Sequence, residues 1–156
     1  MTKEDITIVS YSPEYKEHIK TLNYEWLEKY FVVEPGDVQQ LSDPQQYIID
    51  KGGYIYFAKC KDEIVGTSSL MKTGKEEYEL AKMAVKEKYQ GMGIGQMLLE
   101  HCLAEAAKLQ AIKLSLFSNT KLTSAIHLYK KAGFTEVALP KDVHYERADI
   151  MMELIL

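Results

Sequence analysis

The chain has 156 residues, of which 46% are hydrophobic and 27% charged, and its formal net charge is −4. This length suits one domain with a substantial core, so we expect a single domain over residues 1–156. The negative charge and the lack of a Lys/Arg cluster argue against a nucleic-acid partner. The sequence has no apolar run of membrane-spanning length and nothing that resembles a signal peptide, so we expect no membrane partner and a cytoplasmic location.

The first part of the chain combines one strand with two helices. Ser12 followed by Pro13 is typical of a helix start, with serine as the cap and proline in the first turn. A glycine pair at Gly52 is typical of a helix end. The expected elements are a strand at 5–11, a helix from Ser12 to about Tyr30, a turn-rich connection at 31–37 and a short helix from Asp43 to the glycines.

Strand patterns follow from Tyr54. Three runs rich in β-branched and aromatic residues, at 54–60, 64–71 and 78–85, are separated by short charged turns. Strands joined by such short turns must be antiparallel neighbours. We therefore expect a meander of three strands in the middle of the chain.

A glycine-rich turn follows the third of these strands. Gly91, Gly93 and Gly95 alternate with other residues and precede an amphipathic helix. Glycine allows tight turns and close backbone approach, and the first amides of a helix lack intrahelical partners, so this arrangement can bind a phosphate group. The spacing is not that of a dinucleotide fold or a P-loop. A turn that merely starts a helix is the alternative.

The rest of the chain alternates helices and strands. The helix after the glycines buries one face that includes Leu98, Cys102 and Ala106, and a strand at 111–117 completes a parallel, right-handed crossover. Asn119 or Thr120 is expected to cap a helix at 122–132, which Gly133 ends. Two strands, at 134–138 and 145–154, complete a mixed α/β (α+β) fold.

Two motifs resemble the GNAT superfamily of N-acetyltransferases. Residues 90–95 resemble its acetyl-CoA pyrophosphate loop, and residues 125–134 resemble its A-x-x-L-Y-x-x-x-G-F motif. The order of the expected elements also matches. The resemblance implies a central mixed sheet of about six to seven strands with helices on both faces, splayed between the fourth and fifth strands.

The resemblance further implies acetyl-CoA as co-substrate and direct transfer of the acetyl group to a primary amine. The glycine loop would bind the pyrophosphate, the end of the fourth strand would pair with the pantetheine arm and offer an amide to the acetyl oxygen, and an asparagine after the fifth strand would contact the cofactor. The matching residues are Met83, Ala84, Val85, Gln90, Gly91, Met92, Gly93, Ile94, Gly95, Gln96 and Asn119. For Asn119, a plain helix cap is the alternative.

Two residues are candidates for proton transfer. Tyr129 matches the tyrosine near the sulfur of coenzyme A, and a phenol that is protonated at neutral pH can donate to the leaving thiolate. A core tyrosine is the alternative, because Tyr129 shares an apolar helix face. Glu79 is a candidate general base, although a solvent-facing strand residue would have the same pattern. Strand alternation places Lys82 on the opposite face from Glu79.

The acceptor site is expected between the first two helices, their connection and the last hairpin. Candidate residues are Tyr30, Phe31, Glu34, which could attract a cationic amine, and Tyr145, which lies on an otherwise exposed strand face with Arg147 and Asp149. The acceptor is a small-molecule amine or a protein or peptide amine, and the pattern does not choose between them. A non-catalytic acyl-CoA sensing module is the alternative function.

Two further expectations concern partners and metals. The spacings of the two cysteines and four histidines provide no disulfide framework and no metal site, so no metal cofactor is expected. An open sheet edge makes a homodimer plausible.

Overall fold

The structure, a computed structural model, describes residues 5–143 and 145–156. Its sheet has seven strands in the order β1-β2-β3-β4-β5-β7-β6, and β4 and β5 are parallel while the other neighbouring pairs are antiparallel. The strands are β1 (Ile6–Ser10), β2 (Tyr54–Cys60), β3 (Glu63–Gly74), β4 (Glu77–Val85), β5 (Lys113–Ser118), β6 (Thr135–Val137) and β7 (Ile150–Ile155). The predicted mixed sheet is confirmed.

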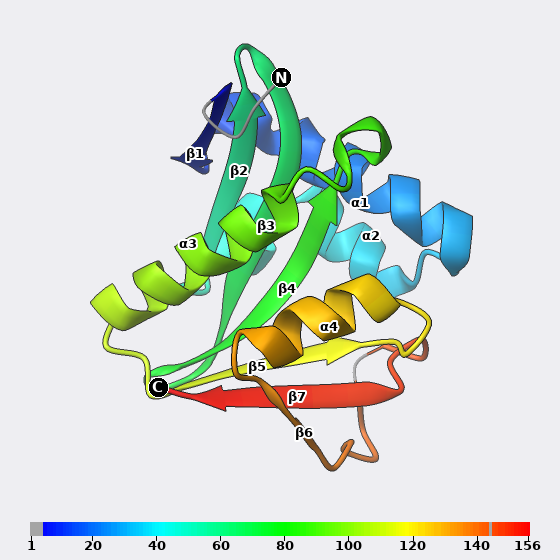
Figure 1. Cartoon of the computed structure of the whole chain (residues 1–156), viewed down its shortest axis with the longest axis vertical. Coiled ribbons are helices and arrows are strands. Elements are labelled where there is room, and N and C mark those ends of the chain that lie inside the picture. Colours follow the sequence, from blue (N-terminus) through cyan, green and yellow to red (C-terminus); the bar gives the residue numbers. More distant parts are fainter. Residues whose placement is uncertain (1–4, 144) are drawn as a thin grey trace.

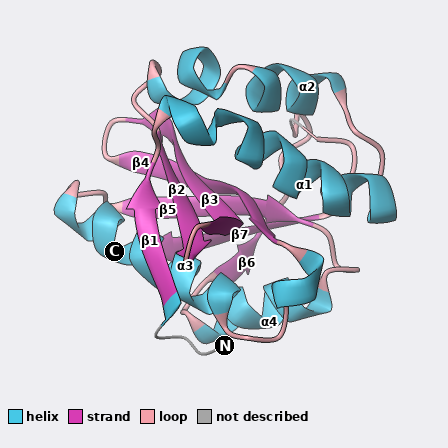
Figure 2. Ribbon diagram, turned by 90° about the horizontal axis from the view of Figure 1, so that it is seen from above, coloured by secondary structure: helices cyan, strands magenta, loops and turns pink. Residues whose placement is uncertain are grey.

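Helices cover both faces of this sheet. Figure 2 shows α1 and α2 on one face and α3 and α4 on the other. The α-helices are α1 (Lys16–Tyr30), α2 (Pro35–Ser42), α3 (Ile94–Lys108) and α4 (Thr123–Lys131). Three shorter helical turns are η2 (Pro13–Tyr15), η3 (Gln45–Ile49) and η4 (Glu87–Tyr89). No helix among the described residues is long and apolar enough to cross a membrane.

Two large hydrophobic clusters hold the helices against the sheet. On one face, Leu99 and Cys102 of α3 and Tyr129 of α4 pack with Leu80 of β4 and Leu114 of β5. On the other face, side chains of α1, α2 and η3 pack on β2 and β3, among them Ile19, Leu41, Ile48 and Phe57. Burying large aliphatic and aromatic side chains on both faces of a sheet is the main stabilising contribution to such a fold.

The strands β4 and β5 separate soon after they meet, as predicted. They pair only from Glu77 with Lys113 to Glu79 with Ser115. Beyond this point β4 continues beside β3, whereas β5 continues beside β7, and Figure 1 shows the two strands diverging. From Leu80 onward, the edge of β4 that is directed toward β5 therefore faces a gap, while its other edge stays paired with β3.

Two segments differ from the sequence-based expectation. The connection at 31–37 was expected to be a turn, but helix α2 begins at Pro35 because Glu34 and Asp37 form a capping box around that proline. The strand expected at 145–154 begins only at Ile150, and residues 145–149 form a loop. Both segments border the cavity described next. The sheet edges are β1 and β6, and dimerisation through an edge stays a prediction.

Candidate active site

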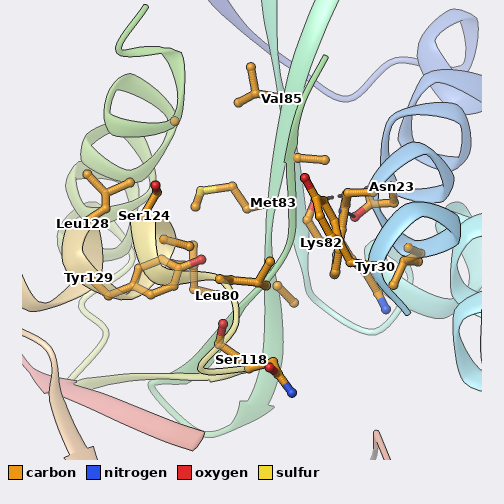
Figure 3. A pocket seen from close by; sticks show the side chains of 18 of the residues that line it. Asn23, Tyr30, Leu80, Lys82, Met83, Val85, Ser118, Ser124, Leu128 and Tyr129 are labelled. Atoms are coloured by element: carbon orange, nitrogen blue, oxygen red, sulfur yellow. Dashed lines mark hydrogen bonds between the residues drawn. The ribbon is translucent and has the colours of Figure 1, made fainter. Parts of the chain in front are cut away.

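A cavity of about 680 Å³ occupies the gap between β4 and β5. It is bordered by α1 on one side, by α4 on the other, and by the glycine loop and the 145–148 loop at its ends. Fourteen of the predicted site residues line it: Tyr30, Phe31, Glu79, Met83, Ala84, Val85, Gln90, Gly91, Gly93, Ile94, Gly95, Asn119, Tyr129 and Tyr145. Met92, Gln96 and Glu34 do not belong to its lining. Figure 3 shows the lining side chains on both sides of β4.

The glycine loop ends in a helix N-terminus that faces this cavity. Gly91 and Gly93 both have φ of +82°, a left-handed conformation that side-chain-bearing residues seldom adopt, and Gly93 is the N-cap of α3. The amide of Met97 is bonded to the Gly93 carbonyl at 3.0 Å, so the amides before it lie in the first turn, where helix geometry provides no intrahelical acceptor. Gln90 anchors the loop, since its Nε2 donates to the Val85 carbonyl at 3.1 Å.

A β-bulge interrupts β4 next to the gap. Ser69 of β3 pairs with Ala81 and Thr67 pairs with Ala84, so β4 contains one extra residue here, and Lys82 has φ of +56°. The bulge breaks the alternation of side chains that the sequence-based argument assumed. The prediction that Lys82 lies on the face opposite Glu79 is therefore wrong: Figure 3 shows Lys82 on the α1 side of β4, and the charge of Glu79 acts on the pKa of Lys82.

Four charged side chains form a cluster on the α1 side of the cavity. Arg147 donates to both oxygens of Asp37, at 2.7 and 2.8 Å, and to Glu34 at 3.1 Å. Lys82 Nζ donates to Asp37 at 3.1 Å. Asp37 is fully buried. Burial opposes its ionisation, but hydrogen bonds from Arg147 and the Glu34 backbone and the nearby positive charges outweigh this, so the pKa of the Asp37 carboxyl lies below its ordinary value.

Tyr145 joins this cluster to the cavity. Its hydroxyl donates to Gln40 at 3.1 Å and accepts from Lys82 Nζ at 3.2 Å. Burial, and then the charge of Glu79, raise the pKa of the Tyr145 hydroxyl. Burial lowers the pKa of Lys82 despite the opposing charge of Asp37. Glu79 is itself buried, which contradicts a solvent-facing strand position.

The loop at 145–149 corrects a further expectation. Tyr145 is buried and the side chain of Arg147 is only 14% exposed, so these residues do not form an exposed strand face. The guanidinium of Arg147 lies 4.6 Å from the Tyr145 ring centre and 5.7 Å from that of Trp26. Aromatic faces attract a cation at such distances, and this contact holds the loop against α1.

Tyr129 is at once a core residue and a cavity residue. Its ring packs in the cluster under α4, at 6.0 Å from the ring of Phe134, and burial raises the pKa of its hydroxyl. Figure 3 shows the hydroxyl directed across the cavity toward Leu80 and Met83 of β4. The two interpretations of Tyr129 are therefore compatible, because the ring is packed and the hydroxyl faces the site.

Two predicted residues have their polar groups engaged by the protein. Asn119 was a candidate helix cap, but α4 begins at Thr123 and the Asn119 side chain instead donates to the Arg147 carbonyl at 2.7 Å and accepts from the Lys121 amide at 2.9 Å. Glu34 accepts from the amide of Glu146 at 2.9 Å and from Arg147. Both residues tie neighbouring loops to the 145–149 loop.

Four of the lining residues that sequence reasoning did not identify belong to the charged and hydrogen-bonded network on the α1 side. Asn23, Asp37, Lys82 and Arg147 line the cavity, and they come from α1, α2, the β4 bulge and the last loop. One local signal was present, because the pairing of Glu34 with Asp37 three residues later is the spacing of a capping box. The others become neighbours only through the fold.

Comparison with known proteins identifies the family. The family model described as an acetyltransferase (GNAT) domain matches residues 51–136. The uncharacterized N-acetyltransferase YvbK of Bacillus subtilis (strain 168) is 32% identical over 116 residues, which cover 70% of this chain and 75% of YvbK. The family model spans the glycine loop and Tyr129, so the match includes both motifs of the site.

Solved structures have the same fold. An acetyltransferase of the GNAT family from Staphylococcus aureus Mu50 has a TM-score of 0.84 at 22% identity, covering 95% of this chain and 97% of that one. A GNAT family acetyltransferase from Elizabethkingia anophelis, solved with acetyl-CoA bound, has a TM-score of 0.67 at 25% identity, covering 99% and 100% of the two chains. The protein belongs to the GNAT family of acetyltransferases.

Proposed function

We propose that the protein transfers the acetyl group of acetyl-CoA directly to a primary amine bound in the same cavity. The observation that carries this proposal is the continuity of the cavity, which joins the glycine loop, the Tyr129 hydroxyl and the charged cluster through the gap between β4 and β5. A single cavity of this kind can hold a thioester donor and an acceptor together, and bringing two reactants into one site is itself a large contribution to rate.

The donor side fits acetyl-CoA. The first-turn amides of α3 and the left-handed glycines before it are suited to a pyrophosphate. The backbone edge of β4 beyond Glu79, where no strand pairs with it on the β5 side, is suited to the amides of a pantetheine arm, which would pair with Met83, Ala84 and Val85 as an added strand does. The bound acetyl-CoA of the Elizabethkingia anophelis relative supports the same assignment.

The reaction needs two proton transfers. As the amine nitrogen bonds to the acetyl carbon and the carbon–sulfur bond breaks, the amine loses a proton and the thiolate gains one. Glu79, a buried carboxylate in the cavity wall, is the proposed acceptor of the first proton, directly or through water. Tyr129 is the proposed donor of the second, because its hydroxyl faces the cavity and a phenol is protonated at neutral pH.

The acceptor side is proposed to lie between α1 and the 145–148 loop. Tyr30, Phe31 and Tyr145 line this part of the cavity. Glu79 lines this cavity whereas Glu34 does not, so we assign attraction of an ammonium group to Glu79 rather than to Glu34. The charged residues of the lining are Asp37 and Glu79 against Lys82, Lys121 and Arg147, and this excess of positive charge favours a small amine over a polycation.

The test is acetyl-CoA turnover, followed by thiol release, across a panel of small amines, amino acids and lysine peptides. Tyr129→Phe should lower kcat by about 10²-fold and leave acetyl-CoA affinity unchanged, because it removes the proton donor but keeps the ring. Tyr78→Phe is the matched control, since Tyr78 is a buried tyrosine of the same cluster that does not line the cavity. Tight acetyl-CoA binding without turnover for any acceptor would instead indicate an acyl-CoA sensing module.

A further inference from the structure

The peptide between Lys82 and Met83 is held in one orientation by Asn23 of α1. The carbonyl of Lys82, the bulge residue with φ of +56°, accepts a hydrogen bond from Asn23 Nδ2 at 3.2 Å. In a planar trans peptide the N–H points opposite to the C=O. Figure 3 shows Asn23 on the α1 side of β4 and the Met83 side chain on the side of Tyr129. The N–H of Met83 is therefore directed away from α1, into the gap between β4 and β5.

The hydrogen bonds of Asn23 leave its side chain a single orientation. Asn23 is fully buried. The indole Nε1 of Trp26 can only donate, and it lies 3.2 Å from Oδ1, whereas the carbonyls of Ile19 and Lys82 can only accept, and they lie 2.9 and 3.2 Å from Nδ2. Exchanging the oxygen and nitrogen of the amide would break all three bonds. The side chain is thus a fixed donor toward the bulge.

Lys82 needs such support because of its backbone conformation. A residue with a side chain is strained in the left-handed region and persists there only when its surroundings hold it. Lys82 is held at its carbonyl by Asn23 and at its Nζ by Asp37 and Tyr145. Of these contacts, the one to the carbonyl acts on the same peptide as the Met83 N–H.

We propose that Asn23 is a positioning residue for acyl transfer, which fixes the bulge so that the Met83 N–H faces the thioester carbonyl oxygen. This inference rests on the proposed acetyl transfer. When the amine adds to the acetyl carbon, the carbonyl oxygen gains negative charge, and the charge returns to form the amide as the carbon–sulfur bond breaks. A fixed N–H directed at that oxygen stabilises the charge without reorganising during the reaction. Asn23 itself touches neither substrate nor reacting atoms in this assignment.

The first test replaces Asn23 by leucine, which keeps the number and branching of the side-chain heavy atoms and removes the donor. We expect Asn23→Leu to lower kcat by about 10- to 100-fold while the KM for acetyl-CoA changes by less than about threefold, because a donor displaced by about 1 Å loses transition-state stabilisation but not ground-state binding. Asn23→Asp, which keeps the acceptor for Trp26 but has no N–H, should likewise lower kcat and leave the KM for acetyl-CoA nearly unchanged. Trp26→Phe, which removes the hydrogen bond that orients Asn23, should lower kcat by a smaller factor.

The second readout is the carbonyl stretching band of bound acetyl-CoA labelled with ¹³C at the acetyl carbonyl. In the native protein a hydrogen bond from Met83 should move the band to lower frequency than that of free acetyl-CoA. In Asn23→Leu the band should return toward the free position. Leu22→Ala is the matched control, since Leu22 is the buried neighbour on α1 and its loss lowers stability without removing a donor. This control should keep the native band.

The outcomes separate the two proposals. A shifted band in the native protein that stays shifted in Asn23→Leu and Asn23→Asp, with kcat unchanged, would overturn the role of Asn23 and leave acetyl transfer standing. The absence of any bound acetyl-CoA band in the native protein would overturn both. If Asn23→Leu does not fold, Trp26→Phe and Asn23→Asp decide the matter through the same two readouts.

Discussion

At the scale of single residues, two buried hydroxyl groups, those of Tyr129 and Ser69, differ in whether they border the cavity. The hydroxyl of Tyr129 borders the cavity and is kept protonated by its buried surroundings, so it can serve as an acid at pH values where acceptor amines lose their proton. The hydroxyl of Ser69 is equally buried, but it lies outside the cavity lining. Among the buried side-chain nitrogen and oxygen atoms of the described residues, Ser69 Oγ has no hydrogen-bond partner.

Replacing Ser69 by alanine is expected to stabilise the protein. A buried polar group without a partner costs about 1–3 kcal/mol, so Ser69→Ala should raise the free energy of unfolding by about 1 kcal/mol in urea titrations. The control is Thr67→Val on the same strand, because Thr67 Oγ1 donates to the Tyr56 carbonyl at 2.9 Å and its loss should lower stability by about 1 kcal/mol. A loss of stability in Ser69→Ala would show that this hydroxyl has a partner in solution.

At the scale of elements, the sequence was most informative where local chemistry alone decides the structure. The β-branched and aromatic runs of β2, β3 and β4, the apolar face of α3 and the glycine stop at Gly133, with φ of +106°, all depend on residues close in the chain. The glycine loop was predictable for the same reason. These elements form the proposed donor side of the site.

The bulge in β4 could not be read from the sequence in this way. Lysine has no preference for the left-handed conformation, so nothing local marks Lys82 as the extra residue. The bulge forms because contacts from α1, α2 and the last loop hold it. The helix at Pro35 was missed for the opposite reason: proline and glycine are typical of turns, and here they stand in the first turn of a helix.

Two glycines of the loop should respond differently to alanine. Gly91 has φ of +82° in open space, so Gly91→Ala introduces backbone strain and should lower the free energy of unfolding by about 1–2 kcal/mol. Gly95 is helical, and its added Cβ would contact Leu128 and Val85 at 3.8 and 4.0 Å, which is ordinary packing. Gly95→Ala should therefore keep or slightly raise stability, by less than about 1 kcal/mol.

The two glycine variants also separate an effect on stability from an effect on acetyl-CoA binding. Gly95 lines the cavity, so its new methyl group should raise the KM for acetyl-CoA while thermal unfolding stays at or above the native temperature. Equal acetyl-CoA affinity in Gly95→Ala and the native protein would show that the donor does not pass this part of the loop.

At the scale of the whole molecule, the charged cluster connects segments that are distant in the chain. Asp37 lies in α2, Lys82 in β4 and Arg147 in the last loop, and the two cations share the two oxygens of one buried carboxylate. Apart from the capping-box spacing of Glu34 and Asp37, no local pattern predicts this cluster, because α2, Lys82 and Arg147 become neighbours only in the folded chain. The proposed acceptor side of the cavity is therefore formed by tertiary contacts, whereas the glycine loop of the proposed donor side is formed by local sequence.

Replacing Asp37 by asparagine tests how far this cluster holds the molecule together. The change leaves Lys82 and Arg147 without their shared carboxylate, and removing one partner of a buried ion pair costs about 3–5 kcal/mol, which urea unfolding at pH 7 would measure. Because the folded-state pKa of Asp37 is lowered, its contribution is fully present above the unfolded-state value of about 3.9 and is lost as pH falls through the folded-state pKa. The gap between the native protein and Asp37→Asn should therefore be constant near neutral pH and narrow below about pH 4.

The exposed turn residue Asp62 provides the control for this pH dependence. Asp62→Asn should change stability by less than about 0.5 kcal/mol at any of these pH values, since a surface acid away from such a cluster contributes little. A gap between the native protein and Asp37→Asn that does not narrow in acid would mean that the asparagine acts through packing alone. A stability difference that narrows would show that the ionised carboxylate joins α2, β4 and the last loop, and that the proposed acceptor side of the cavity depends on that charge.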